Sequence, residues 1–248
     1  MNKINEFVES FAAIHSTKYR RDIDGLRGIA VLAVVICHAF PSLLHGGFVG
    51  VDIFFVISGY LISSILIKDL EQGNFSIIRF YDRRIRRIFP ALVCVVLAAI
   101  LIGWVILFRS EFQLLGKHVV ASSLFSENFL LWSESSYFDV SSDKKPLLHL
   151  WSLAIEEQFY IVWPLVVFLI YRGYVKFITV FLVLGGVSFA ANIYYIFHDL
   201  TPAYYSPLSR GWELMIGACL AYLQKYRPEL VSRHAGMQSV AGLVLIVA

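Results

Sequence analysis

Long apolar runs alternate with short polar segments along the whole 248-residue chain. A helix that crosses a bilayer needs about 20 mostly apolar residues, and six runs approach or reach this length. They cover residues 28–44, 50–67, 90–108, 150–171, 177–197 and 209–223. A further apolar run after Ser239 extends to Ala248 and is shorter than a span. The pattern predicts an all-α polytopic transmembrane helix bundle with about six complete spans and a truncated seventh.

The composition agrees with this pattern, because 58% of the residues are hydrophobic and 16% are charged. A soluble domain has roughly 45–50% apolar and about 25% charged residues. We therefore expect the lipid bilayer as a partner and no nucleic acid. The three cysteines, Cys37, Cys94 and Cys219, lie in separate apolar segments without metal-ligand spacing. They indicate buried structural thiols, and we expect no metal.

The basic residues predict the orientation, since cytoplasmic loops are enriched in Lys and Arg. If the N-terminal tail is cytoplasmic, so is loop 68–89, which holds six basic residues. The apolar stretch 118–132 is ambiguous because it is short and contains Glu127 and Asn128. The basic residues Arg172, Lys176, Lys225 and Arg227 are cytoplasmic only if that stretch does not span. We therefore predict a re-entrant or interfacial segment within a long outer loop, 109–149.

Arg27 and His38 are polar residues in the otherwise apolar stretch LRGIAVLAVVICHAF. In an α-helix eleven residues advance about 16 Å and return to within about 20° of the same direction. The two side chains therefore share a helix face. An arginine at the end of a span can serve as an anchor, and a histidine can simply bond a neighbouring carbonyl. An ionisable residue inside a membrane also marks a functional site, so both interpretations stay open.

The stretch FYDRRIRRIFPA places four arginines before Pro90, which we expect to open the next helix. Guanidinium groups grip phosphate oxygens bidentately, and a helix N-terminus adds anion affinity. The same arginines are also typical of a topology signal on a cytoplasmic loop. Phosphate binding is only slightly favoured over that alternative.

Two further stretches carry polar groups into predicted spans. In KPLLHLWSLAIEEQFYIVWP, Glu156 is expected to orient an imidazole or to pair with a buried arginine, and Glu157 to face the outer rim. In GGFVGVDIFFVISGYLI, the glycines and the serine are expected to permit close helix packing, and Asp52 to border the site. Arg210 and Glu213 are three residues apart on one helix face and are predicted to pair with each other or with partners across the bundle.

These stretches together resemble the acyltransferase family 3 membrane proteins, most closely the subgroup that O-acetylates bacterial surface polysaccharides. The resemblance begins near residue 19, so we assign residues 1–18 to a cytoplasmic tail and residues 19–248 to the membrane domain. It implies that Arg27, His38 and Glu156 are catalytic and that Arg84 and Arg87 bind the coenzyme. It also implies that Asp52, Trp151 and Ser152 bind the substrate.

The resemblance also implies acetyl-CoA as cytoplasmic donor and a hydroxyl of a surface or lipid-linked glycan, such as lipopolysaccharide, as acceptor across the bacterial inner membrane. His38 either takes the proton of the attacking hydroxyl or receives the acetyl group itself. Two alternatives stay open: a transporter with Arg27 and His38 in its path, and an inactive remnant. Family members have about ten spans and often a following SGNH-type domain. We therefore expect this chain, expressed alone, to be inactive.

Overall fold

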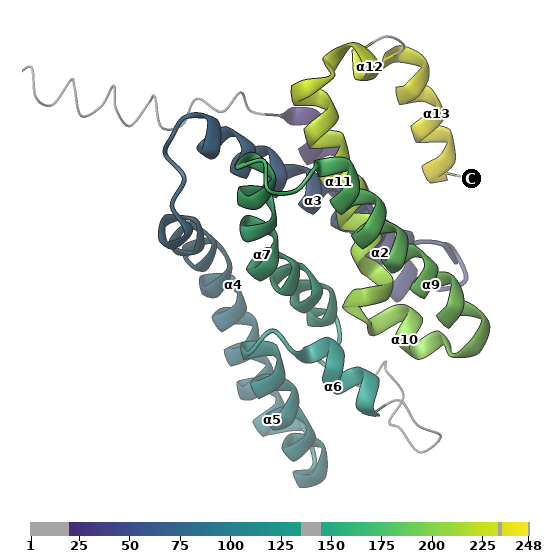
Figure 1. Cartoon of the computed structure of the whole chain (residues 1–248). Coiled ribbons are helices and arrows are strands. Elements are labelled where there is room, and N and C mark those ends of the chain that lie inside the picture. Colours follow the sequence, from purple (N-terminus) through teal and green to yellow (C-terminus); the bar gives the residue numbers. More distant parts are fainter. Residues whose placement is uncertain (1–19, 135–144, 233–234, 248) are drawn as a thin grey trace, which may run out of the picture. The chain divides into compact units, whose positions relative to one another are not determined.

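The structure, a computed structural model, describes residues 20–134, 145–232 and 235–247. Every regular element within these ranges is a helix (Figure 1), which confirms the all-α prediction. The chain divides into two units, Met1–Ile57 and Ser58–Ala248, and each is described by itself. The predicted cytoplasmic tail, residues 1–18, lies outside the described residues.

The first unit contains α2 (Arg21–Ala39) and the beginning of α3 (Val49–Glu71). Helix α2 begins seven residues before the predicted span and therefore includes the polar stretch that precedes the apolar run. A Cβ atom at Gly47 would overlap the backbone carbonyl oxygen of Ala33 on α2. The close approach of the two helices therefore requires glycine, as the small-residue pattern predicts.

The core of the second unit joins α3, α4 (Ile77–Ile106), α7 (Leu150–Tyr171) and α11 (Pro207–Tyr226). Each of these helices contributes apolar side chains that are almost fully buried, among them Leu66, Phe80, Trp163 and Met215. Gly59 brings α3 against α11, since a Cβ atom there would overlap the carbonyl oxygen of Leu214. Helix α7 has the predicted bounds.

Helix α4 corrects the prediction around Pro90. The helix begins at Ile77, where the hydroxyl of Ser76 caps it, and it continues through Pro90 to Ile106. At 1.5 Å per residue its 30 residues are about 45 Å long. Proline removes one hydrogen bond but is tolerated inside membrane helices. The prediction that Pro90 opens a helix is therefore wrong, and the four arginines lie along a helix rather than beside its N-terminus.

The ambiguous stretch 118–132 is broken into two helices, α5 (Arg109–Ser123) and α6 (Glu127–Glu134). Phe125 lies between them with a left-handed backbone, φ 52°. Its carbonyl oxygen accepts a hydrogen bond of 2.8 Å from the Gln158 amide on α7. Neither helix is long and apolar enough to span a membrane. The predicted placement on the outer side remains a prediction, and residues 135–144 of that loop lie outside the described residues.

Residues 177–198 form one long apolar helical stretch with a π-helical turn. Its parts are α8 (Phe177–Val180), the π turn η2 (Phe181–Gly185) and α9 (Gly186–His198). The Ser188 hydroxyl on α9 accepts a 2.8 Å hydrogen bond from the Trp212 backbone on α11. The short α10 (Leu200–Tyr205) links α9 to α11, and α12 (Pro228–Ser232) and α13 (Ala235–Val247) follow.

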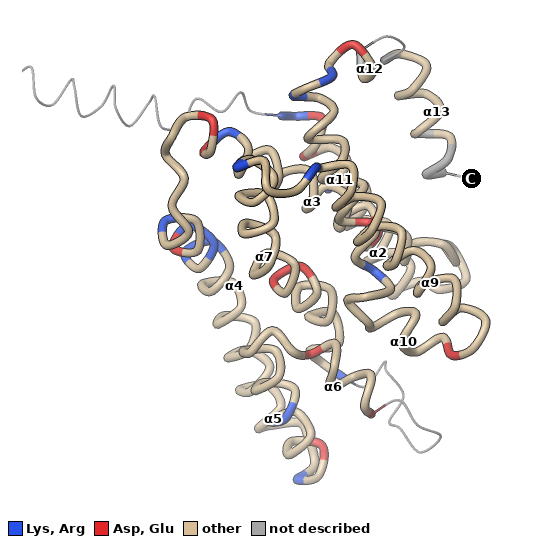
Figure 2. Tube along the Cα trace, in the orientation of Figure 1, with Lys and Arg blue, Asp and Glu red and all other residues tan. Residues whose placement is uncertain are grey.

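Four helical stretches in the described part of the chain are long and apolar enough to cross a membrane: Val49–Glu71, Ile77–Ile106, Leu150–Tyr171 and Phe177–His198. They support a multi-pass membrane protein. Helices α2 and α11 are not among these four stretches, so the predicted count of six spans plus a truncated seventh is not confirmed. Charged residues are sparse along these helices except at the end of α3, near the start of α4 and partway along α7 (Figure 2).

Candidate active site

His38 lies in the last turn of α2, exposed, with ring atom Nδ1 2.8 Å from the carbonyl oxygen of Val34. A carbonyl oxygen only accepts hydrogen bonds, so Nδ1 carries the proton and donates. In the neutral ring this leaves the lone pair on Nε2, which is the atom available to accept a proton. Arg27 is half-buried on the same helix, as the spacing predicts.

Asp52 is half-buried near the start of α3. It belongs with Arg27 and His38 to the first unit, whereas the other predicted site residues belong to the second. The structure therefore does not test whether the two groups form one site, and their joint role remains a prediction.

A buried polar cluster lies inside the second unit, and we call it the Glu156 cluster. Its members come from α3, α4 and α7 and are Ser58, Arg84, Glu156, Glu157 and Tyr160. The Ser58 hydroxyl donates to Glu156 Oε2 over 2.8 Å, and the Tyr160 hydroxyl donates to the same oxygen over 3.1 Å. The two hydroxyls also contact each other. Glu156 is thus held by two donors from two helices.

Arg84 contacts the neighbouring carboxylate rather than Glu156. Its NH2 group lies 3.1 Å from Glu157 Oε1, and its guanidinium lies 4.2 Å from the centre of the Tyr160 ring. The side chains of Arg84 and Glu157 are only 15% and 12% exposed. The prediction that Glu157 faces the outer rim is therefore wrong, because Arg84 on α4 provides it with a buried counter-charge.

The other three arginines near Arg84 face away from the cluster. Arg83 pairs with Asp69 over 2.6 Å, and Arg86 pairs with Asp82 over 3.0 Å. Arg87 is exposed, with no ion pair or hydrogen bond in the described part of the chain. Arg84 is thus already paired with Glu157, whereas Arg87 has no such partner among the described residues. Their role in coenzyme binding remains a prediction.

Trp151 and Ser152 occupy the first turn of α7. Trp151 is buried, with its ring centre 4.5 Å from that of Tyr204 and 5.8 Å from the Arg210 guanidinium. Arg210 also pairs with Glu213 over 2.7 Å, which confirms that prediction. Ser152 donates to the carbonyl oxygen of His149 at the start of its own helix. The structure thus gives Trp151 a packing role and leaves Ser152 separate from the Glu156 cluster.

A second buried polar cluster joins α5 and α6, and of its members the sequence analysis singled out only Glu127. We call it the His118 cluster: His118, Ser122, Glu127, Glu134 and Lys145. His118 Nδ1 donates to Glu127 Oε1 over 2.6 Å, and Lys145 pairs with Glu134 over 2.8 Å. Desolvation lowers the pKa of the nearby His149 imidazole, and the Glu127 carboxylate partly offsets this effect.

Sequence reasoning missed Ser58 and Tyr160 as members of the Glu156 cluster. Tyr160 lies four residues after Glu156, and i,i+4 neighbours share a helix face, so its contact with Glu156 was predictable. Ser58 lies 98 residues from Glu156, and no local signal connects them. A carboxylate held by two hydroxyls, with a second carboxylate neutralised beside it, suits the positioning of a reacting group or of a proton.

Comparison with known proteins identifies the family to which the chain is similar. The model of an acyltransferase domain family matches residues 20–248. The chain is 40% identical over 220 residues to YrhL of Bacillus subtilis, covering 84% of this chain and 34% of that protein. It is 36% identical over 243 residues to the peptidoglycan O-acetyltransferase OatA of Listeria monocytogenes, covering 94% and 39%.

The O-acetyltransferase OatA of Staphylococcus aureus is 37% identical over 242 residues, again covering 94% of this chain and 39% of that protein. The chain therefore spans between a third and two fifths of the length of these three relatives. No solved structure matches it.

Proposed function

This chain belongs to the acyltransferase 3 family, and we propose that it is the membrane part of an O-acetyltransferase acting on a cell-surface glycan. The donor in this proposal is cytoplasmic acetyl-CoA, and the acceptor is a hydroxyl group presented at the outer side of the cytoplasmic membrane. Family membership argues against the transporter alternative.

The observation that carries the proposal is the Glu156 cluster. Ser58, Arg84 and Glu156 come from three of the stretches that resemble the family, and the cluster brings their side chains together among apolar helices. Intramembrane ionisable groups are rare and are commonly functional.

In the proposed reaction His38 acts as general base through Nε2. It accepts the proton of the acceptor hydroxyl while the hydroxyl oxygen forms a bond to the acetyl carbonyl carbon. The carbon–sulfur bond breaks, and the imidazolium returns the proton to the departing thiolate. An imidazole suits both steps because it exchanges protons near neutral pH. The alternative, acetyl transfer through the ring nitrogen itself, uses the same atom.

Peptidoglycan is the first acceptor to test, because the relative from Listeria monocytogenes carries that substrate in its name. Lipopolysaccharide and exopolysaccharide are further acceptors within the proposal.

The test uses the full-length protein in a host that lacks its own glycan O-acetyltransferase. Mild base releases ester-linked acetate from the purified glycan, and the acetate is quantified. We expect His38→Ala to lower it by about a hundredfold or more, the usual contribution of a general base. His198→Ala is the matched control, because His198 Nδ1 makes the same contact with the carbonyl oxygen four residues earlier, over 2.7 Å. Wild-type acetate from a well-expressed His38→Ala protein would refute the assignment.

A further inference from the structure

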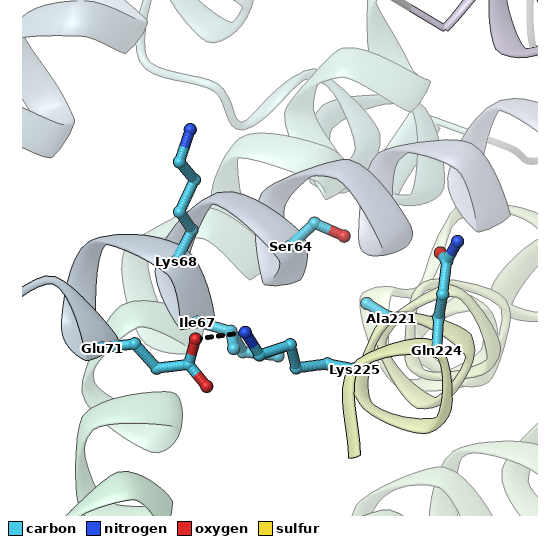
Figure 3. Close-up of a pocket in the computed structure, with 7 residues that line it drawn as sticks. All are labelled: Ser64, Ile67, Lys68, Glu71, Ala221, Gln224 and Lys225. Carbon is cyan, nitrogen blue, oxygen red and sulfur yellow. Dashed lines mark ion pairs between the residues drawn. The ribbon is translucent and has the colours of Figure 1, made fainter. Parts of the chain in front are cut away.

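Two adjoining cavities open between the ends of α3, α7 and α11 in the second unit. The first, about 190 Å³, is called the polar cavity here because five of its seven lining residues are polar or charged: Ser64, Ile67, Lys68, Glu71, Ala221, Gln224 and Lys225 (Figure 3). The second, about 300 Å³, is largely aromatic and shares Ile67 with the first. Its remaining walls include Trp163, Tyr171, Phe177, Ala218 and Tyr222.

The polar cavity contains cations that suit an anionic ligand. Lys225 pairs with Glu71 over 2.5 Å. Lys68 extends from α3 away from this pair (Figure 3) and has no ion pair or hydrogen bond within the described ranges. Arg172 and Lys176 lie next in sequence to wall residues of the aromatic cavity. The basic residues at these helix ends are the ones that predict the cytoplasmic side.

The aromatic cavity suits a long, mostly uncharged chain. Along α7 its walls extend from Trp163 to Tyr171, which is about 12 Å at 1.5 Å per residue. Ring stacking holds its outer wall, since the centres of Phe177 and Tyr222 are 3.9 Å apart. At its inner end the Trp163 indole donates to the Ser63 hydroxyl over 2.7 Å.

The inner end of the aromatic cavity points toward the Glu156 cluster. Trp163 lies seven residues after Glu156, which is about two helical turns, so both side chains project from the same face of α7 about 10 Å apart along the axis. The same pair of helices is bridged at both levels, by Trp163 with Ser63 and by Glu156 with Ser58.

We propose that the two cavities together bind the acyl donor, with a coenzyme A phosphate in the polar cavity and the pantetheine arm in the aromatic one. This inference rests on the proposed function and moves the donor site away from Arg84, whose charge Glu157 already neutralises. Lysine ammonium groups bind phosphate as point charges. Ligand pockets usually measure roughly 300–1,000 Å³, so the aromatic cavity holds one arm of such a ligand rather than all of it.

The test measures equilibrium binding of coenzyme A to the full-length protein in lipid nanodiscs. Lys68→Glu should weaken binding by about tenfold at low salt, as expected for reversing one charge near a phosphate. Glu71→Gln should tighten binding by about threefold or more, because it frees Lys225. Lys117→Glu on α5 is the control with the same change of charge elsewhere, and it should bind like the wild type.

A second variant tests the aromatic cavity. Ala218 is 1% exposed on its wall, and Ala218→Phe should fill the space and lower coenzyme A affinity by tenfold or more. Its thermal unfolding temperature is measured in parallel, and Ala218→Val serves as a smaller step if Phe unfolds the protein. Unchanged affinity in the folded Ala218 variants and in Lys68→Glu would overturn the proposal. The proposal would also be overturned if these variants changed only the binding of an anionic phospholipid and left coenzyme A affinity unaltered.

These measurements separate the donor site from the proposed reaction. Glycan acetylation with unaltered coenzyme A affinity in every folded cavity variant would refute the donor site and leave the reaction intact. Altered affinity without any glycan acetylation would support the donor site and refute the reaction.

Discussion

The buried ion pair between Arg84 and Glu157 gives a quantitative prediction about the second unit. Arg84→Met removes the cation and leaves the Glu157 carboxylate, 12% exposed, without its counter-charge. Removing one partner of a buried pair costs about 3–5 kcal/mol. The lost contact with the Tyr160 ring contributes about 0.5–1 kcal/mol more. Because both side chains keep some exposure and solvent screens them, we expect a total slightly below the sum of these two values, about 3 kcal/mol.

The assay is thermal unfolding of the purified full-length protein in detergent. For a domain of 150–250 residues, 1 kcal/mol corresponds to roughly 2–4 °C, so Arg84→Met should lower the midpoint by about 6–12 °C. The double variant Arg84→Met with Glu157→Leu should recover most of this loss, because well-packed apolar residues often replace a buried pair at little cost.

Arg83→Met on the same helix is the matched control. Its ion pair with Asp69 is 2.6 Å long but 46% and 22% exposed, and exposed pairs contribute at most about 1 kcal/mol. Its midpoint should therefore fall by no more than about 4 °C. Strictly additive effects of the Arg84 and Glu157 substitutions would show that the two side chains do not interact, and the reasoning would be refuted.

Two further predictions concern α3. Ser58→Ala removes one hydrogen-bond donor from Glu156 and should lower kcat for acetyl transfer more than it changes KM. Ser58→Thr keeps the hydroxyl and should retain more activity. Equal losses of activity in both variants would indicate a packing effect instead. Gly59→Ala places a methyl group against the Leu214 carbonyl and should greatly reduce the yield of folded protein. Gly116 has open space around it, so Gly116→Ala should not reduce the yield. A normal yield of Gly59→Ala would contradict the contact between α3 and α11.

The sequence was sufficient to predict the apolar helices and the tight contacts at glycines. Helix α7 runs from Leu150 to Tyr171 as predicted, because an uninterrupted apolar run specifies both its type and its length. Helix α4 was misjudged because proline usually marks a helix boundary, and nothing local shows that a helix passes through it. The break at Phe125 was also hidden, since its left-handed backbone is held by Gln158 from another helix.

The site residues show the same limit. A spacing rule places Arg27 and His38 on one face of α2, and no longer-range information is needed. The partner of Glu157 cannot be deduced in this way, because Arg84 lies 73 residues away on α4. A buried carboxylate needs a cation beside it, and residues 83–87 contain four arginines that could provide one. Only the packing of α4 against α7 determines that Arg84 is the partner.

The hydrogen bonds of His38 and Glu156 also limit how these two residues can act. In a neutral imidazole only one ring nitrogen carries a proton, and in His38 that proton is donated to the Val34 carbonyl. The Val34 carbonyl therefore already fixes the ring tautomer, so a carboxylate is not needed for that task while this bond persists. Both hydroxyl donors of the Glu156 cluster contact Oε2. Within the described residues Oε1 has no hydrogen bond, so it is the atom left to accept one from a substrate. Under the proposed function Glu156 would hold the acceptor hydroxyl or the donor amide, while its predicted role of orienting the imidazole stays a prediction, because His38 belongs to the first unit.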